Sequence, residues 1–563
     1  MAIEDELRVH AEGPVEYSAG TPTEAAPRAG APVLELKTFR RMQRETRSPG
    51  APAKVAVIVC HGMGQQVPYE TIDMIAGSLL GRDMSQPAPP ANSHVRQVKF
   101  GDDLLGRAEI TLERPPKDGD VEKRKIEKRE VHIYEAYWAP LTAGKVTLMD
   151  VVWFLLKACA CGSWTMLTGA LKFKRWMFGD FKVMKTRLRE FVYLLFALKV
   201  ILALGLIYFA FGWSVLAYLL GGGIPSFGPE LVQNLRTTLV AFAALLGGGG
   251  LILFVLWLVR GKLHTGFFAT LLTKAILLVA LLLLLGICGL GFCVLVLYGH
   301  HVLKTFGSPE PGCIIGTLTR IYDCVIGFEQ WFMNLTQSHA RTWFYLAAAA
   351  IGLVFAIGRW FLIEYMGDVT AYVAAHTASK FYELRTQIQQ VAFKVFNAVY
   401  GAQTANGDHE YDTIVVTGHS LGSVLTYDTL NAFINYDTLL QNHSVKVLER
   451  TPMLVTFGSP LDKTAFLFKN QIKGAIFREA LAATKQPMIL DYKYRPKRWI
   501  NIYNRADWIS GSLDYYDDPQ APANLTQRVE NIEDLEGFFP LLAHTEYPGH
   551  EELRKALMQG IFS

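Results

Sequence analysis

A serine lies at the centre of a short glycine-flanked motif in the C-terminal third of this 563-residue chain. Residues 412–426 read DTIVVTGHSLGSVLT, so Ser420 stands between Gly418 and Gly422. The β-branched run before the motif predicts a strand, and the residues after it predict a helix. A tight turn between strand and helix exposes a serine hydroxyl, and glycines let the neighbouring backbone approach it. We therefore predict that Ser420 is a nucleophile and that the N–H of Leu421 faces an oxyanion.

A nucleophilic serine needs a histidine as its base and a carboxylate that orients the histidine. After an elbow of this kind, the acid and then the histidine follow along the chain. Apolar strand candidates follow Ser420 at 453–460 and 499–507, and Asp507 ends the second of them. We expect Asp507 to be the acid. The rival carboxylates are Asp514, Asp517 and Asp518.

The base must be one of the histidines that follow the elbow, which are His443, His544 and His550. His443 precedes the strand that should carry the acid, so it is out of order. His544 lies between an apolar stretch and a final predicted helix, whereas His550 fits the exposed face of that helix. We predict His544 as the base. His419, next to the nucleophile, should point elsewhere and serve a structural role.

A second glycine-rich turn lies far upstream, in KVAVIVCHGMGQQ at 54–66. VAVIV is a short continuous apolar run, which predicts a buried parallel strand. The turn that follows consists of His61, Gly62, Met63 and Gly64. Alone, such a turn is equally typical of an ordinary strand end.

The composition places these motifs in an unusual setting. Hydrophobic residues make up 51% of the chain and charged residues 19%, which excludes a wholly disordered protein. The seven cysteines are too few for a small disulfide scaffold, and the net charge of +4 is too scattered to favour nucleic acid. No His/Cys/Asp cluster has metal-ligand spacing, so we expect neither a metal nor another cofactor.

The apolar excess is concentrated between the two motifs. Four segments have the length and lack of charge of transmembrane helices: roughly 198–220, 238–259, 275–298 and 342–363. A fifth segment, 146–170, contains Asp150 and Lys157, and we expect it to lie at the membrane interface.

The connections between these segments alternate between rich and poor in basic residues. Residues 171–190 are the richest, and the long connection 299–341 is poor. This pattern predicts a multi-pass protein, such as one of a bacterial inner membrane, with both termini in the cytoplasm. Cys313 and Cys324 would lie outside, where they could pair, although two separate thiols fit equally well.

The N-terminal 1–50 segment begins with an acidic stretch that is not a signal peptide. Residues 11–33 are rich in Ala, Pro, Glu and Gly, so we expect a disordered tail. The basic stretch 37–48 is either a solvated linker or a contact for anionic lipid head groups.

Four stretches together resemble the intracellular phospholipases A1, members of the lipase-like α/β-hydrolase superfamily. They are GDVTAYV (367–373), the helical 381–400, VVTGHSLGSVLTYDTL (415–430) and TFGSPLD (456–462). The resemblance covers roughly 365–550 and the His-Gly strand at 54–66. It implies Ser420 as nucleophile, Asp507 as acid and His544 as base.

The resemblance also implies that the Met63 N–H, in the loop at 61–64, is the second oxyanion donor. The sequence departs from that family in two ways. It lacks the extra C-terminal domain with an Asp-Asp-His-Asp constellation, and it carries the apolar block inside the hydrolase. The resemblance therefore bears on the reaction class and leaves the substrate open.

The two motifs can form one site only if both lie on the same side of the membrane, which requires an even number of spans. Four spans satisfy this condition, and the alternation of basic residues independently indicates four spans. We therefore predict an α/β-hydrolase fold, a mostly parallel sheet flanked by helices, interrupted by a helical transmembrane block. The predicted divisions are a tail (1–50), two hydrolase parts (51–145 and 365–563), an interfacial segment (146–190) and a transmembrane block (191–364).

The expected function is that of a cytoplasm-facing serine hydrolase that cleaves carboxylic esters, with membrane lipids as both environment and substrate. A membrane-tethered esterase or thioesterase acting on other substrates is one alternative. The other is a membrane scaffold or transport protein with an inactive hydrolase domain, although the spans carry few ionisable residues for a transport pathway.

Overall fold

The computed structural model describes residues 16–19, 36–42, 52–64, 66–81, 93–114, 127–168, 172–177, 180–185, 192, 195–205, 245, 247–256, 258–259, 267–305, 356, 358–360, 362–374, 379–439, 445–464, 495–517, 528–537 and 542–563. The chain divides into two compact units. The first comprises Met1–Val151, Lys174–Met184 and Ile363–Ser563, and the second comprises Val152–Phe173 and Lys185–Leu362.

The first unit is built on an eleven-stranded sheet that is mostly parallel at its centre. From β13 to β6 every neighbouring pair is parallel, whereas β5 runs antiparallel to both β6 and β4. In spatial order the strands are β13 (Val529–Glu533), β12 (Arg498–Tyr503), β11 (Met453–Phe457), β10 (Thr413–His419), β3 (Ala53–Cys60), β6 (Glu127–Ala136), β5 (Asp103–Arg114), β4 (Ser93–Phe100), β1 (Glu16–Ala19), β2 (Phe39–Arg41) and β9 (Ala402–Gln403).

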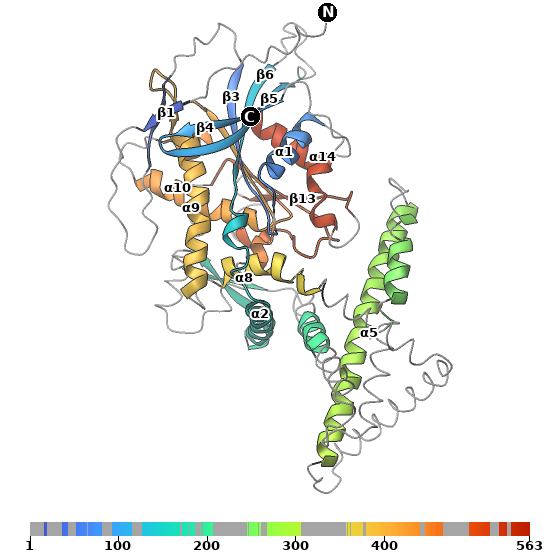
Figure 1. The fold of residues 1–563 in the computed structure, drawn as a ribbon. Helices are drawn as coiled ribbons and strands as arrows, with labels where there is room; N and C mark the ends of the chain where they lie inside the picture. Colours follow the sequence, from blue (N-terminus) through green and yellow to red (C-terminus); the bar gives the residue numbers. More distant parts are fainter. Residues whose placement is uncertain are drawn as a thin grey trace, which may run out of the picture. The chain divides into compact units, whose positions relative to one another are not determined.

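Helices cover both faces of the sheet, as Figure 1 shows. Helices α1 (Glu70–Leu80) and α14 (Glu551–Ile561) pack on one face, and α9 (Ser379–Gly401) and α10 (Leu421–Leu439) pack on the other. Side chains alternate between the two faces along a strand. Because helices cover both faces, the central strands are apolar on both. Val55, Val57 and Val59 of β3 join the α1 and α14 face, whereas Ala56 and Ile58 between them are equally buried. The structure therefore has a mixed, mostly parallel α/β architecture.

The register brings the two glycine-rich motifs to one edge of the sheet. In the parallel pair of β3 and β10, Cys60 lies opposite Gly418. In the next pair, His419 of β10 lies opposite Phe457 of β11. The carboxyl ends of parallel strands meet at the same edge, where sites in α/β proteins are usually formed. The turns after β3 and β10 are therefore neighbours, although more than 350 residues separate them along the chain.

Shorter helical elements lie in the connections between the strands and the longer helices. They are η1 (Ala139–Leu141), the π-helical turn η3 (Leu362–Met366), α8 (Gly367–Val373), α11 (Val447–Arg450), η5 (Asp514–Tyr516), η6 (Leu542–His544) and η7 (Tyr547–Gly549).

The predicted interfacial segment forms α2 (Leu148–Thr168), and β7 (Lys172–Met177) pairs with β8 (Asp180–Lys185). In the second unit, α5 (Phe267–Thr305) contains the predicted span 275–298. Most of the other three predicted spans, together with Cys313 and Cys324, lies outside the described residues. Within the described part of the chain, no helix has the combination of length and hydropathy that a membrane crossing requires.

The N-terminal segment contains order that its composition did not predict. Two short strands, β1 and β2, pair with each other, and β1 also pairs with β4. The physical cause is packing against distant parts of the chain: the Phe39 ring lies edge-on to Phe100 with centroids 5.7 Å apart. Arg41 is buried and forms an ion pair with Glu410 at 3.4 Å. The expected disordered tail thus holds at least these two strands of the sheet.

Candidate active site

The elbow around Ser420 has a strained backbone. Ser420 has φ 51°, in the left-handed region that residues with a Cβ rarely adopt. The flanking glycines are needed for close approach. A Cβ on Gly418 would lie 2.6 Å from the Ser423 Cα, and one on Gly422 would lie 2.1 Å from the His61 carbonyl oxygen. The turn therefore packs the start of α10 directly against the end of β3.

Ser420, His544 and Asp507 form one hydrogen-bonded series. The distance from Ser420 Oγ to His544 Nε2 is 2.8 Å, and that from His544 Nδ1 to Asp507 Oδ2 is also 2.8 Å. The three side chains come from the β10–α10 turn, from η6 and from the loop after β12. An imidazole with Nδ1–H on the carboxylate has Nε2 free to accept the serine proton. The structure thus brings together the three residues that the sequence selected.

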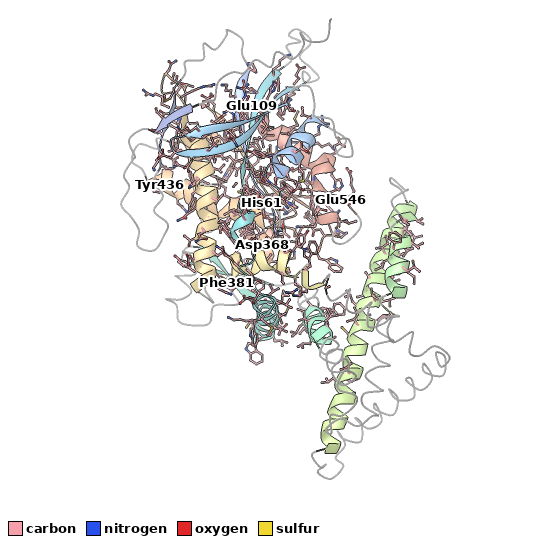
Figure 2. All side chains as sticks on the ribbon, in the orientation of Figure 1. His61, Glu109, Asp368, Phe381, Tyr436 and Glu546 are labelled. Atoms are coloured by element: carbon pink, nitrogen blue, oxygen red, sulfur yellow. The ribbon has the colours of Figure 1, made fainter. Side chains whose placement is uncertain are left out.

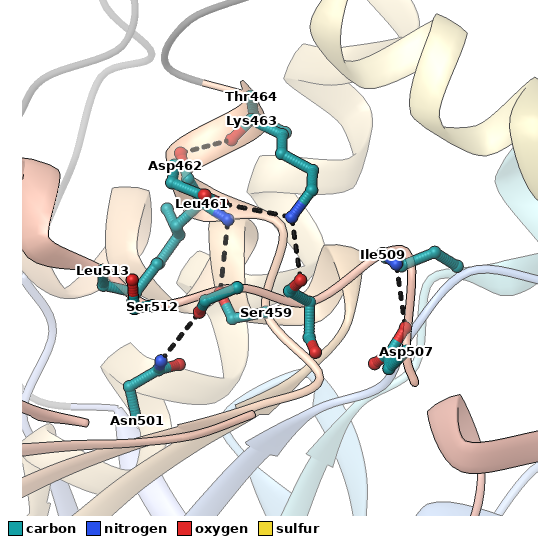
Figure 3. Close-up of polar contacts among 12 residues, drawn as sticks. Ser459, Leu461, Asp462, Lys463, Thr464, Asn501, Asp507, Ile509, Ser512 and Leu513 are labelled. Atoms are coloured by element: carbon teal, nitrogen blue, oxygen red, sulfur yellow. Dashed lines mark hydrogen bonds and ion pairs between the residues drawn. The ribbon is translucent and has the colours of Figure 1, made fainter. Parts of the chain in front are cut away.

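Asp507 is held as a carboxylate by several donors. Burial alone would raise its pKa, but hydrogen bonds from His544, the Ile509 N–H and the Tyr547 hydroxyl lower the pKa to about 2. The Ile509 N–H donates to Oδ1 at 2.8 Å, as Figure 3 shows. The Tyr547 hydroxyl donates to Oδ2 at 2.9 Å, and Ser510 Oγ lies 3.0 Å from the same phenol oxygen. Asp507 therefore stays ionised beside the histidine.

The turn after β3 lies against the nucleophile. A Cβ on Gly62 would be 2.9 Å from the Ser420 Cβ, so only glycine fits there without movement. Met63, the next residue, is buried, as is Leu421 on the other side of the serine. Leu421 directly follows Ser420, and Met63 directly follows the glycine that packs on Ser420, so both residues predicted to face an oxyanion are next to residues in this contact.

His61 anchors this turn with a neutral ring. Its Nε2 accepts the backbone N–H of Trp138 at 2.9 Å and that of Ala139 at 3.1 Å. Its Nδ1 lies 2.7 Å from the Gly62 carbonyl oxygen, which fixes the proton on Nδ1. Burial lowers the pKa of His61 to about 4, so the ring stays neutral. The ring also stacks on Trp138, with centroids 4.7 Å apart.

Gly64 fixes the other end of the turn. Its φ is +96°, and its N–H donates to Asp368 Oδ2 at 2.7 Å. A Cβ at this position would lie 2.9 Å from the Tyr365 ring. His61 and Asp368, which hold the two ends of the turn, are both labelled in Figure 2.

His419 hydrogen-bonds to the backbone of His544. Its Nε2–H donates to the His544 carbonyl oxygen at 2.8 Å, and its ring stacks on Phe457. Burial, together with the nearby His544, lowers the pKa of His419 to about 3. A neutral His419 therefore holds the backbone of His544, the predicted base.

The rival candidates lie elsewhere. His550 Nδ1 contacts Asp534 Oδ2 at 2.5 Å. Asp514 contacts Asn531 and Ser512, and Asp517 accepts the Val529 N–H. His443 and Asp518 lie outside the described residues.

Burial and donor chemistry limit what this site can do. Ser420 is fully buried and His544 is 5% exposed, so neither residue is open to bulk solvent in the structure. In the ranges that the structure describes, no group of three or more His, Cys, Asp or Glu side chains could hold a metal ion. The arrangement is suited to nucleophilic attack by a serine with histidine as general base.

Sequence reasoning missed two supporting residues, Tyr547 and Asp368, and one contact of His419. Tyr547 follows His544 by three residues, and a phenol so close to the base was the signal available for it. Asp368 was noted only within GDVTAYV, and its signal was a carboxylate in an otherwise apolar helix. His419 was expected to be structural, but its bond to the His544 backbone has no signal in the sequence.

Comparisons with known proteins add no family to this picture. No protein-family model matches the chain, and neither a curated protein nor a solved structure matches it significantly.

Proposed function

We propose that this protein is a serine hydrolase that cleaves carboxylic esters through an acyl-enzyme. The observation that carries the proposal is the continuous series from Ser420 Oγ through His544 to Asp507, with both hydrogen bonds at 2.8 Å and the serine at φ 51°. A strained serine with a base on its hydroxyl and an ionised acid behind the base is the arrangement that activates a serine nucleophile.

The reaction would proceed in two halves. His544 Nε2 takes the proton of Ser420 as the oxygen attacks the ester carbonyl carbon, and Asp507 stabilises the imidazolium. The N–H groups of Leu421 and Met63 stabilise the oxyanion, an effect worth about 10²–10³ in rate per donor. His544 then protonates the leaving alcohol. Water, deprotonated by His544, hydrolyses the acyl-serine and restores the enzyme.

The fold proposed for the first unit is that of the α/β-hydrolases, in the part of that superfamily that includes intracellular phospholipases A1. The parallel order from β11 through β10 and β3 to β6 supports it, with the nucleophile at the end of a central strand. The order Ser420, Asp507, His544 along the chain also supports it. Residues 191–364 enter as an insertion between β6 and α8.

We further propose that the insertion anchors the enzyme in a membrane, with both termini in the cytoplasm, and that the ester belongs to a lipid. The support is the sequence: long apolar segments with at most one charged residue each, and the alternation of basic residues between them. In α5 many large apolar side chains are exposed, among them Leu278, Leu282 and Leu295. An exposed apolar surface of this kind is suited to contact with lipid.

The test compares substrates on the full chain in membranes and in detergent. Phospholipid, triacylglycerol, a water-soluble nitrophenyl ester and an acyl thioester are offered to the wild type and to Ser420→Ala. Turnover of a lipid ester by the wild type alone is the expected result. Turnover confined to the soluble ester or the thioester would replace the lipase proposal by an esterase or a thioesterase. No turnover of any substrate would favour a scaffold with an inactive hydrolase domain.

A further inference from the structure

The turn from His61 to Gly64 is held at two points, one on each side of Met63. The His61 ring accepts the N–H groups of Trp138 and Ala139, and the Gly64 N–H donates to Asp368. The first point is formed by Trp138 and Ala139, which follow the end of β6 in the sequence. The second reaches a residue 304 positions away, at the start of α8.

Asp368 is a buried carboxylate, and the Gly64 N–H is one of the few groups that compensate for its burial. It is only 5% exposed, and burial raises its pKa to about 6, although Thr142 and the Gly64 N–H lower it. Burying a carboxylate is costly unless hydrogen bonds compensate. Glu364 is the other acidic group that acts on it, and it also raises the pKa. The Asp368 carboxylate that accepts the Gly64 N–H is therefore a buried acidic group that lowers the stability of the fold. Such groups are typical of functional sites.

The contact is made at a backbone conformation that glycine adopts and other residues rarely do. Gly64 has φ +96°, and the Tyr365 ring closes the space on its Cα. Tyr365 and Asp368 belong to the same short segment, so this segment holds Gly64 through both a ring and a carboxylate.

Space is available next to the contact. Gly64, Thr142 and Asp368 line a small pocket together with Ala139 and Gly367. If the Asp368 side chain were shortened, the turn would lose its bond and gain room to relax. A displacement of about 1 Å in a catalytic group can cost on the order of 10²-fold in rate.

We propose that Asp368 is a positioning residue for the oxyanion site: by holding the Gly64 N–H it fixes the peptide of Met63 against Ser420. The inference rests on the proposed serine hydrolase function. It adds that the segment directly after the apolar insertion, and not only the hydrolase strands, sets the geometry of the oxyanion site.

The main test uses two substitutions and a matched control. Asp368→Ala removes the acceptor, and we expect kcat to fall about 10–100-fold with KM nearly unchanged, because the loss is confined to the transition state. Asp368→Asn keeps an oxygen that can accept the Gly64 N–H, so it should retain most of the activity. The control is Asp437→Asn, because Asp437 is another buried carboxylate that accepts backbone N–H groups, from Val445 and Val447, away from the site.

A second measurement does not depend on turnover. In amide hydrogen exchange, Asp368→Ala should speed the exchange of the peptide that contains Gly64, while Asp437→Asn should not. Unchanged exchange there, or a kcat for Asp368→Ala equal to that of an active wild type, would overturn the inference and leave the proposed function intact. An inactive wild type would remove the proposed function, and the exchange result would still decide whether Asp368 holds the turn.

Discussion

The histidines of two buried histidine–aspartate pairs, His544 and His550, lie six residues apart, and of the two only His544 has a hydrogen bond to a serine within the described part of the chain. His544 Nδ1 contacts Asp507 Oδ2 at 2.8 Å, and His550 Nδ1 contacts Asp534 Oδ2 at 2.5 Å. Burial does not separate them: the imidazoles are 7% and 12% exposed, and the carboxylates 1% and 0%. The difference is at the second ring nitrogen, where His544 Nε2 meets Ser420 Oγ at 2.8 Å.

The surroundings of His550 also differ. Burial lowers its pKa, but Asp534, Glu536 and Glu546 together raise the pKa above the usual value. A raised pKa favours the charged form of the imidazole, which is a structural cation and cannot accept a proton as a general base. The comparison teaches that a buried His–Asp pair does not identify a base. The group that the free nitrogen faces does.

The largest expected effect separates the two histidines. His544→Ala should reduce kcat for an ester by about 10⁴-fold or more, since the base and nucleophile act as a unit. The matched control, His550→Ala, should keep kcat near that of the wild type. Steady-state hydrolysis by the two purified variants measures both. Similar losses in the two variants would mean that His544 is not the general base.

The two aspartates should differ in kind. Asp507→Asn should lower kcat by about 10³–10⁴-fold, because the amide no longer fixes the tautomer or stabilises the imidazolium. Asp534→Asn should instead reduce the free energy of unfolding by about 1–3 kcal/mol, the effect of weakening a charged hydrogen bond. Turnover and thermal melting, measured on both variants, give the crossed pattern. A stability loss without a rate loss in Asp507→Asn would contradict it.

A smaller effect should come from Tyr547, whose hydroxyl donates to Asp507, whereas no tyrosine of the described residues donates to Asp534. Tyr547→Phe removes one donor to Asp507 Oδ2 and should lower kcat about tenfold, corresponding to roughly 1.4 kcal/mol, with KM unchanged. Tyr400→Phe is the control, because the buried Tyr400 hydroxyl bonds to Thr451 outside the site. Equal rates for the two variants would show that the phenol has no part in positioning the acid.

The smallest effect concerns stability and pH. Because the pKa of His550 is raised in the folded protein, its stabilising contribution is fully present below the unfolded value of 6.5. That contribution is lost as the pH rises through the folded pKa. His550→Gln should therefore lower the melting temperature more at about pH 5 than at about pH 9. A difference that grows with pH would mean that His550 is buried in its neutral form.

Local sequence patterns were sufficient for the parts of the fold with strong periodicity. The apolar runs at β3, β10, β11 and β12 are continuous and end in turn residues, so both their type and their approximate limits were predictable. The expected chain order of acid and then base limited the candidates for these two roles, because only three histidines follow Ser420 in the sequence. This is why Ser420, Asp507 and His544 could be selected before their distances were known.

The parts that escaped prediction depend on partners far away in the sequence. β1 and β2 are short strands in a region of loop-like composition, and they are ordered by pairing with β4 and β9 and by packing such as that of Phe39 on Phe100. Asp368 meets Gly64 across 304 residues, and His419 meets the His544 carbonyl across 125. Neither contact leaves a local pattern, since each is defined only when the sheet has brought the two segments together.

The central claim is that Ser420 is an activated nucleophile, and labelling with a fluorophosphonate probe in native membranes tests it most directly. The wild type, Ser420→Ala and Ser512→Ala are compared, because Ser512 is a serine outside the proposed site. We predict covalent labelling of the wild type and of Ser512→Ala, with the adduct on the peptide that contains Ser420, and none of Ser420→Ala. Labelling that persists in Ser420→Ala, or a wild type that stays unlabelled in both membranes and detergent, would contradict the claim.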